Sequence, residues 1–472
     1  MRHLFPLQHQ YQQTLPSSTT TAMASFETIE QRTLRYQIPR YYVDFMFHRY
    51  FRTEVVGMEQ LDPAKTYIFT PNHQGALIDA LAILCMKHRW QPVFLARADI
   101  FKNPRVANIL YYLKILPIFR IRDGYESLNN NDRVFQKTLD VLRCRNGLVM
   151  LPEGNHGGFK RLRPLKKGVA RIAFRALQAM PEGPELQIVP VGLDYSNYVN
   201  ARSHLLVRLG KPFGLAPYMD LYHKNPALAY NALMDDLGQR MRAEMIHIES
   251  EEHYAAYMRL LELFSHVYIK RHGLPRTRTQ KFSIDKQLVA ALDAMQHDDP
   301  ELFTHTVTKL HRYDAITKEH RLSNRAAPFG RAPWALLPVQ ALALLATLPV
   351  FVYGYVNNFL ELLLPYKVSG MFNDKQFISS VRYVVATIAF PLLYLLQTLA
   401  VGLATHSWCW ALLYMASLPL GLVLAYLWRK RFYHFVRRCR LAHLARTRPA
   451  EARELNQLFA ELYAQFEPLI EA

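Results

Sequence analysis

Three long runs without a charged residue lie in the last third of the chain and limit what it can fold into. They are residues 334–360, 383–405 and 408–428, with 27, 23 and 21 residues. A helix needs roughly 20 apolar residues to cross the hydrocarbon layer of a membrane, so each run is long enough. A soluble protein would have to bury all three as core helices. We therefore expect C-terminal transmembrane helices.

The charges around these runs predict how they cross the membrane. A basic cluster directly follows the third run: Arg429, Lys430, Arg431, Arg437, Arg438 and Arg440. The positive-inside rule places that cluster in the cytoplasm, and the basic N-terminal region, which lacks a secretory h-region, is expected there too. Two cytoplasmic ends need an even number of crossings. We expect the second and third runs to form a hairpin and the first, which contains Pro338 and Pro349, to cross incompletely.

Shifts in composition divide the chain into six segments. They are a disordered lead (1–25), an interfacial aromatic and basic helix (26–53), an α/β domain (54–220), a helical connector (221–330), membrane segments (331–430) and a cytoplasmic helical tail (431–472). The lead is rich in Gln, Ser and Thr, and Met23 within it is an alternative start. The second segment mixes aromatic rings with arginines, which suits a headgroup layer. The alternative is an ordinary amphipathic helix packed on the next domain.

Short β-rich runs alternate with helical stretches in the third segment. The strand-like runs are TYIFT, PVFLAR, ILPIFRI, LVMLP, QIVPVGLDY and LLVRLG, and the helical ones include ALIDALAILCM, RVFQKTLDVLRC and GVARIAFRALQAM. Such alternation predicts the α/β class, with layers built around a mostly parallel sheet. In these folds the functional side chains gather at strand ends and in the loops that follow.

The net charge of +19 and the sequence pI of about 9.7 favour a polyanionic partner. Nucleic acid and an anionic membrane face both meet that description. The chain carries no zinc-finger, RNA-recognition or helix-turn-helix pattern, so we expect a lipid bilayer and no nucleic acid. The four cysteines are scattered without metal-ligand spacing, so we expect no metal site.

Two blocks in the α/β segment place polar side chains just after strand-like runs. The first, PNHQGALID, puts His73 in a strand-to-helix loop and Asp79 at the start of the next helix. A carboxylate behind an imidazole fixes the tautomer of a histidine base, although a histidine that merely caps a loop has the same pattern. The second block, LPIFRIRDG, carries Arg120 and Arg122, whose guanidinium groups suit a phosphate.

Two further blocks follow along the chain. The third, LPEGNH, ends a strand-like run and carries Glu153, Gly154 and His156, and a basic stretch that includes Lys167 comes next. Such a loop could hold the hydroxyls and phosphate of a substrate, or be a solvated charged loop. The fourth, IVPVG, carries Pro190 on an apolar strand that either lines an acyl channel or belongs to the core.

In order and spacing the four blocks resemble the phospholipid/glycerol acyltransferase superfamily, which includes lysophosphatidate and glycerol-3-phosphate acyltransferases. The resemblance covers about residues 55–215 and implies an α/β acyltransferase domain with His73 and Asp79 as the catalytic pair. It also implies substrate-binding residues: Arg122 and less surely Arg120, Glu153 and Gly154 for the glycerol phosphate, Pro190 for the acyl donor, and Lys167 in the basic-Gly step after the third block.

Two positions depart from the family pattern. Four residues usually separate the histidine and the aspartate, whereas five separate His73 from Asp79. A branch that resembles the fungal dual-specificity acyltransferases also has five. The third block usually reads Glu-Gly-Thr-Arg but here reads Glu-Gly-Asn-His, so His156, or Lys160 and Arg161 downstream, would replace the arginine.

The resemblance implies a membrane-bound O-acyltransferase of phospholipid biosynthesis. It would need no cofactor, and acyl-CoA or acyl-acyl carrier protein would be the co-substrate. We expect lysophosphatidate as the acceptor by a small margin, with glycerol-3-phosphate as the alternative. A catalytically inactive membrane scaffold or a polyanion-binding protein is the alternative from another class. The catalytic domain is expected on the cytoplasmic face.

Overall fold

A computed structural model describes residues 25–86, 91–118, 130–322 and 336–471. Most of the predicted lead lies outside these ranges, as do Arg120 and Arg122. The described residues form a seven-stranded sheet in the order β1-β7-β6-β2-β5-β3-β4. Its strands are β1 (Arg52–Val56), β2 (Thr66–Pro71), β3 (Val93–Arg97), β4 (Ile115–Ile118), β5 (Leu148–Val149), β6 (Leu186–Tyr195) and β7 (His204–Leu209).

The pairing confirms the predicted α/β class with a mostly parallel sheet. Every pair of neighbouring strands is parallel except β6 and β7, which run antiparallel. The six strand-like runs all became strands. The sequence analysis did not name β1, a short strand at the sheet edge with the sequence RTEVV. Its charged residues hide the alternation that marks a half-buried strand.

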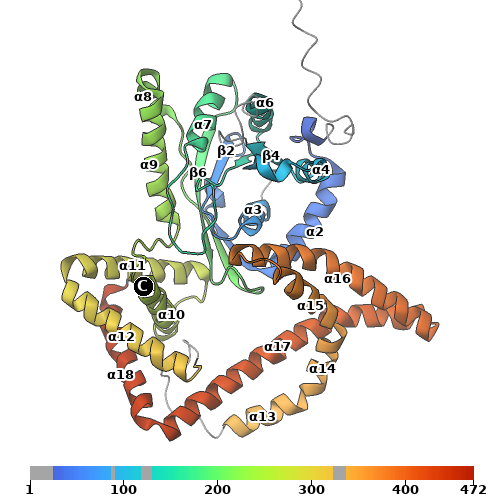
Figure 1. Cartoon of the computed structure of the whole chain (residues 1–472), viewed down its shortest axis with the longest axis vertical. Coiled ribbons are helices and arrows are strands. Elements are labelled where there is room, and N and C mark those ends of the chain that lie inside the picture. The colour runs from blue at the N-terminus through green and yellow to red at the C-terminus, as the bar shows by residue number, and fades with distance from the viewer. Residues whose placement is uncertain (1–24, 87–90, 119–129, 323–335, 472) are drawn as a thin grey trace, which may run out of the picture.

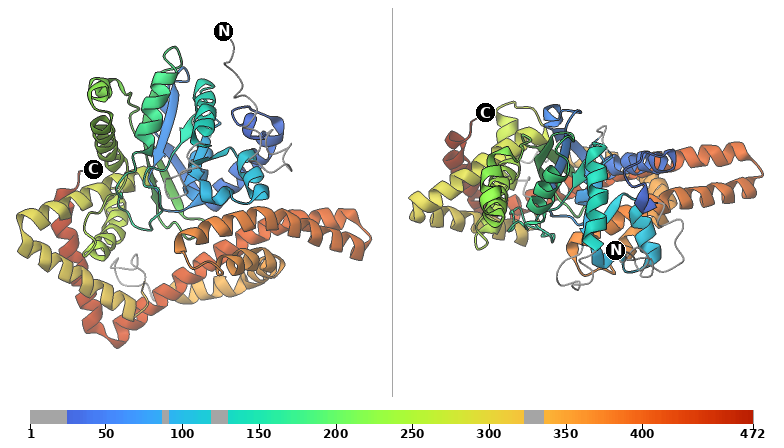
Figure 2. Two further views of the ribbon diagram at one scale, coloured as in Figure 1. Left: turned by 45° about the horizontal axis from the view of Figure 1, so that its top comes forward. Right: turned by 90° about the horizontal axis from the view of Figure 1, so that it is seen from above.

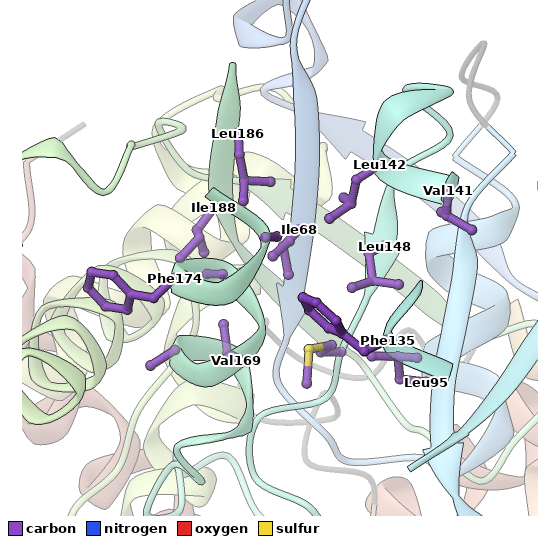
Figure 3. Close-up of a cluster of buried hydrophobic side chains, with 14 of the residues drawn as sticks. Ile68, Leu95, Phe135, Val141, Leu142, Leu148, Val169, Phe174, Leu186 and Ile188 are labelled. Atoms are coloured by element: carbon purple, nitrogen blue, oxygen red, sulfur yellow. The ribbon is translucent and has the colours of Figure 1, made fainter. Parts of the chain in front are cut away.

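Helices cover both faces of the sheet (Figure 1). They are α2 (Leu34–Tyr50), α3 (Leu77–Leu84), α4 (Pro104–Tyr112), α6 (Asn130–Arg143), α7 (Gly168–Ala179), α8 (Met219–Lys224) and α9 (Pro226–Glu244). Successive strand residues point to opposite faces. Ile68 of β2 therefore enters the core under α6, α7 and α9 (Figure 3), and Phe69 enters the core under α2 and α3.

A second helical unit lies beside the sheet domain. It contains α10 (Tyr254–Arg271), α11 (Arg278–Asp298) and α12 (Pro300–Glu319), and α18 (Pro449–Phe466) returns from the end of the chain to join it. The buried face of α18, Leu455, Phe459, Leu462, Tyr463 and Phe466, shares one core with these helices. Within the segment predicted as a helical tail (431–472), α18 therefore closes the helical unit, and the residues before it continue α17 (Trp408–Thr447).

The apolar runs form an extended helical bundle that projects from the sheet domain (Figure 2). It comprises α13 (Leu336–Ala346), α14 (Leu348–Asn357), α15 (Phe359–Ser369), α16 (Lys375–Thr405) and α17 (Trp408–Thr447). Among the described residues, α16 and α17 are each long and apolar enough to cross a membrane. The pair α13 and α14 passes the same test only together and bends by 46° at its break. Helices of this length and composition are suited to a membrane.

Helix α2 has one face packed and one face open. Phe47 is buried against Phe51 and against Tyr383 of α16. On the open face Leu34 and Ile38 are 80% and 71% exposed. The packed face agrees with the alternative of a helix packed on the next domain, and the interfacial position of this segment stays a prediction.

Candidate active site

The loop after β2 carries His73 to the carboxyl end of a central strand. Asn72 fixes the start of this loop, because its side chain donates to the Leu193 carbonyl (3.3 Å) and accepts from the Leu193 N–H (2.6 Å). Both groups of the amide are therefore bonded to β6. The imidazole that follows is held at the edge of the sheet where functional residues of parallel sheets gather.

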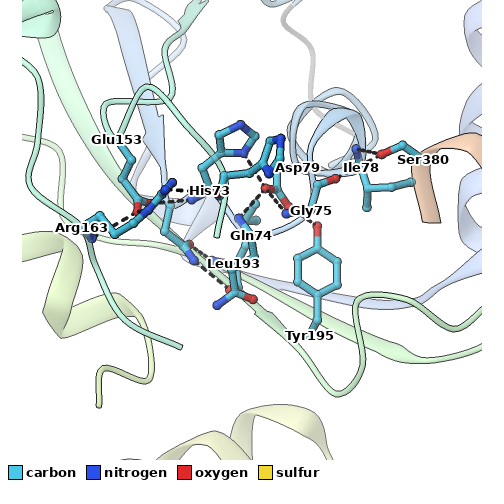
Figure 4. A network of polar contacts seen from close by, with 12 residues as sticks. His73, Gln74, Gly75, Ile78, Asp79, Glu153, Arg163, Leu193, Tyr195 and Ser380 are labelled. Atoms are coloured by element: carbon cyan, nitrogen blue, oxygen red, sulfur yellow. Dashed lines mark hydrogen bonds and ion pairs between the residues drawn. The ribbon is translucent and has the colours of Figure 1, made fainter. Parts of the chain in front are cut away.

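His73 and Asp79 form the hydrogen-bonded pair that the sequence predicts (Figure 4). The His73 Nδ1 lies 2.8 Å from Asp79 Oδ2, and that oxygen also accepts from the N–H groups of Gln74 and Gly75 at 2.7 Å each. Tyr195 donates its hydroxyl to Asp79 Oδ1 at 2.8 Å. A fully buried carboxylate is stable when it is this well bonded. It orients the imidazole so that Nε2 remains for a substrate proton.

Tyr195, the last residue of β6, was not among the predicted site residues. Burial and the adjacent carboxylate of Asp79 raise its pKa well above the ordinary value, so it stays a hydrogen-bond donor. Nothing in the sequence distinguishes it from other aromatic residues at strand ends. Its role depends on the register that aligns β6 with β2.

A tight turn accommodates the additional residue between His73 and Asp79. Ala76 has φ 47° and ψ −125°, and α3 begins at the next residue, Leu77. The turn brings Asp79, in the first turn of α3, back toward the imidazole. The five-residue spacing is thus compatible with a bonded pair.

Glu153 connects the third block to the first. Its Oε1 accepts from the His73 N–H (2.6 Å), and its Oε2 accepts from the backbone N–H (3.1 Å) and Nε (3.0 Å) of Arg163. Burial raises the pKa of this carboxyl, and the bonds from His73 and Arg163 partly offset that rise. Because its oxygens are already bonded, Glu153 positions the two loops in this structure. Its predicted contact with a substrate stays a prediction.

Arg163 is the cation that the basic stretch directs toward the pair. It donates from Nη1 to the His156 carbonyl (3.0 Å), while its buried Nη2 has no hydrogen-bond partner among the described residues. Lys160 instead pairs with buried Asp194, and Arg161 pairs with Glu251. Arg163 belongs to the predicted basic stretch, but His156, Lys160 and Arg161 were the residues expected to replace the family arginine.

His156 lies beside the His73–Asp79 pair. Its ring packs edge-on against the ring of His73, with centroids 5.5 Å apart. Burial, together with His73, lowers the pKa of His156 below its ordinary value. The side chain is therefore neutral at pH 7, and Arg163 is the better source of positive charge for a phosphate.

The other predicted substrate-binding residues that the structure describes lie in different parts of the sheet domain. Gly154 adopts φ 71° in the exposed turn after Glu153, a conformation that favours glycine. Lys167 is exposed at the start of α7. Pro190 is buried within β6, on the face opposite Val189. Arg120 and Arg122 lie outside the described residues.

Comparisons with known proteins cover the same part of the chain. A family model described as Acyltransferase matches residues 52–194. Glycerol-3-phosphate O-acyltransferase 2 of Saccharomyces cerevisiae is 29% identical over 111 residues, which is 23% of this chain and 15% of that protein. Glycerol-3-phosphate O-acyltransferase 1 of the same yeast is 23% identical over 145 residues, 30% of this chain and 19% of that protein. The matches thus span less than a fifth of these relatives.

Among the solved structures that match is the 1-acyl-sn-glycerophosphate (LPA) acyltransferase PlsC from Thermotoga maritima, with 17% sequence identity and a TM-score of 0.28. The match covers 41% of this chain and 76% of that one.

Proposed function

Because residues 52–194 belong to the phospholipid/glycerol acyltransferase superfamily, we propose that the chain is a membrane-associated O-acyltransferase acting on a glycerol phosphate. The donor would be an acyl thioester of coenzyme A or acyl carrier protein. One observation carries the proposal: a histidine–aspartate pair is joined through Glu153 to a guanidinium whose buried Nη2 has no partner in the described structure. The pair supplies a base, and the guanidinium supplies a phosphate contact.

In the proposed reaction His73 Nε2 accepts the proton of the acceptor hydroxyl while its oxygen attacks the thioester carbonyl. The C–S bond breaks as the C–O bond of the ester forms, and the proton passes from the imidazolium to the departing thiolate. Asp79 stabilises the imidazolium through Nδ1. The thioester is already activated, so the proposal requires no metal and no covalent enzyme intermediate.

We propose glycerol-3-phosphate as the acceptor, with lysophosphatidate second. The sequence analysis preferred lysophosphatidate by a small margin. Both curated relatives are named for glycerol-3-phosphate, and the five-residue spacing leans toward the same branch. Lysophosphatidate carries the same phosphate on glycerol and resides in lipid, which suits an enzyme with apolar helices.

A substrate panel tests this proposal directly. Purified protein in nanodiscs is given each acceptor with either acyl-CoA or acyl-acyl carrier protein, and ester formation is measured. We expect acylation of glycerol-3-phosphate with a kcat/KM above that for lysophosphatidate. The reverse order would contradict our choice of acceptor, and acylation of neither would contradict the reaction.

Replacing Arg163 with lysine is expected to raise KM for the phosphate-bearing acceptor by about tenfold. Lysine keeps the positive charge but lacks the planar guanidinium, whose N–H groups can bond Glu153 and a ligand at the same time. KM for the thioester should stay within about twofold, because the phosphates of coenzyme A are separated from the reacting thioester by the pantetheine arm. Equal changes in the two KM values would show that Arg163 acts only on the fold of the loop.

We propose that α16 and α17 cross the membrane as a hairpin, with the catalytic domain on the cytoplasmic face. Cys144 is exposed on the sheet domain, and Cys409 is exposed at the start of α17, beside the hairpin turn. In sealed vesicles with the domain outward, an impermeant maleimide should label a variant that keeps only Cys144. A variant that keeps only Cys409 should react after permeabilisation. Labelling of Cys409 in intact vesicles would contradict the hairpin.

A further inference from the structure

The turn that joins the two halves of the catalytic pair is under backbone strain. It runs from Gly75 to Ile78 and is closed by a bond from the Ile78 N–H to the Gly75 carbonyl (3.0 Å). Ala76 inside it has φ 47° and ψ −125°, which suits the first central residue of a type II′ turn, where glycine is preferred. Such a conformation is unfavourable for a residue with a Cβ and persists when surrounding contacts hold it.

One of those contacts comes from the apolar helix α16. The Ser380 hydroxyl donates to the Gly75 carbonyl (3.2 Å) and accepts from the Ile78 N–H (3.3 Å), so it bridges both ends of the turn (Figure 4). Ser380 is buried, with 4% of its surface exposed. Ala76, at the N-cap of α3, has no side-chain oxygen to cap the helix itself.

The first turns of α16 also contact the loop of the third block. The ring of Phe377 packs edge-on against His156, with centroids 4.9 Å apart, and Asp374 Oδ2 lies 3.7 Å from His156 Nε2. The longest charge-free stretch of α16 begins at Tyr383, within one helical turn of Ser380. The helix expected to enter the bilayer therefore starts against both loops of the site.

We infer that Ser380 is a positioning residue that braces the His73–Asp79 pair, so the helix that anchors the chain in the membrane also completes its active site. The brace is needed because the additional residue places Ala76 in a strained turn. Its catalytic consequence rests on the proposed acyltransferase function, whereas the brace itself can be tested without any substrate.

Replacing Ser380 with alanine tests the inference. The turn can then relax and move Asp79 away from the imidazole, and small misplacements of catalytic groups cost about tenfold or more in rate. We expect kcat to fall by that amount, with both KM values within about twofold of wild type. Adding Ala76→Gly should recover part of the lost kcat, because glycine adopts a positive φ without strain. A double variant no faster than Ser380→Ala would overturn the inference.

Ser379→Ala provides a matched control on the same helix. Ser379 is also buried, but its hydroxyl lies 3.3 Å from the Tyr50 hydroxyl of α2 rather than on the turn. We expect its kcat to stay within about twofold of wild type. An equal loss in the Ser379 and Ser380 variants would mean that general docking of α16 matters, and the brace would be rejected.

Hydrogen exchange separates this inference from the proposed function. In the full-length protein in nanodiscs, peptides covering residues 73–84 should exchange faster in Ser380→Ala than in wild type or Ser379→Ala, because the turn opens more often. Faster exchange in a protein that acylates neither acceptor would support the brace while refuting the reaction. Unchanged exchange would overturn the brace even if the enzyme is active.

Discussion

Replacing His73 with alanine is expected to lower kcat by about 10²–10⁴-fold, the usual contribution of a general base. In the proposed reaction the Nε2 of this imidazole accepts the proton of the substrate hydroxyl, since Nδ1 is bonded to Asp79. KM should change little, because the phosphate contact proposed for Arg163 remains. Initial rates of ester formation at saturating thioester and acceptor provide the measurement.

The control for this variant is His297→Ala. His297 is 89% exposed at the end of α11 and pairs with Asp298, so its loss should leave kcat unchanged. The fold should also survive in His73→Ala, because Asp79 keeps its bonds from Gln74, Gly75 and Tyr195. An enzyme that retains its rate without His73 would refute the mechanism, whereas a lower Tm would indicate that the variant tests folding instead.

Replacing Asp194 with alanine is expected to lower the free energy of unfolding by about 3–5 kcal/mol. Asp194, near the end of β6, is 2% exposed and pairs with Lys160 of the third-block loop and with Arg278 of α11. Its removal leaves two cations without their buried partner. The loss should appear as a lower Tm for protein in nanodiscs.

The pH dependence of this pair follows from the pKa of Asp194. Burial alone would raise that pKa, but Arg278 and then Lys160 lower it to about 2. A carboxyl whose pKa is lower in the folded than in the unfolded state stabilises the fold at pH values above its unfolded-state pKa, which is about 3.9. It loses that contribution as the pH falls toward 2. The difference in Tm between wild type and Asp194→Ala should therefore be constant between about pH 5 and 8.

Two further variants show whether the effect of Asp194→Ala comes from the loss of its buried ion pairs. Asp298→Ala removes an exposed carboxylate and should change stability by less than about 0.5 kcal/mol. The double variant Asp194→Ala/Arg278→Met should lose less than the sum of the two single variants, because it leaves one fewer unpaired charge. A wild-type Tm in Asp194→Ala would show that the ion pair does not join the helical unit to the sheet domain.

The sequence predicted the fold class because its signals are local. The run QIVPVGLDY is apolar from Ile188 to Leu193 because β6 is covered on both faces, and the helical period of GVARIAFRALQAM matches the buried face of α7. The edge strand β1 was missed because its short charged sequence lacks these signals. The return of α18 to the helical unit also could not be predicted, since periodicity identifies a buried face but not its partner.

The candidate site also combines residues that the sequence predicts with residues that it does not. The sequence placed His73 and Asp79 in one strand-to-helix loop, and the structure puts their side chains 2.8 Å apart. It offered several cations after Glu153 without choosing Arg163, because the path of an irregular loop decides which side chain turns inward. Ser380 could not be found from the sequence, since it lies 305 residues from the Gly75 carbonyl that it bonds.

The sequence by itself determined the alternation of strands and helices, the length of the apolar runs and the chemical types in the site. These follow from the spacing of residues along one segment, which sets how a helix or strand is buried. The tertiary structure decided that a strained turn brings Asp79 to His73 and that α16 braces this turn. Such choices depend on contacts between distant segments, and a strained backbone is stable only when those contacts hold it.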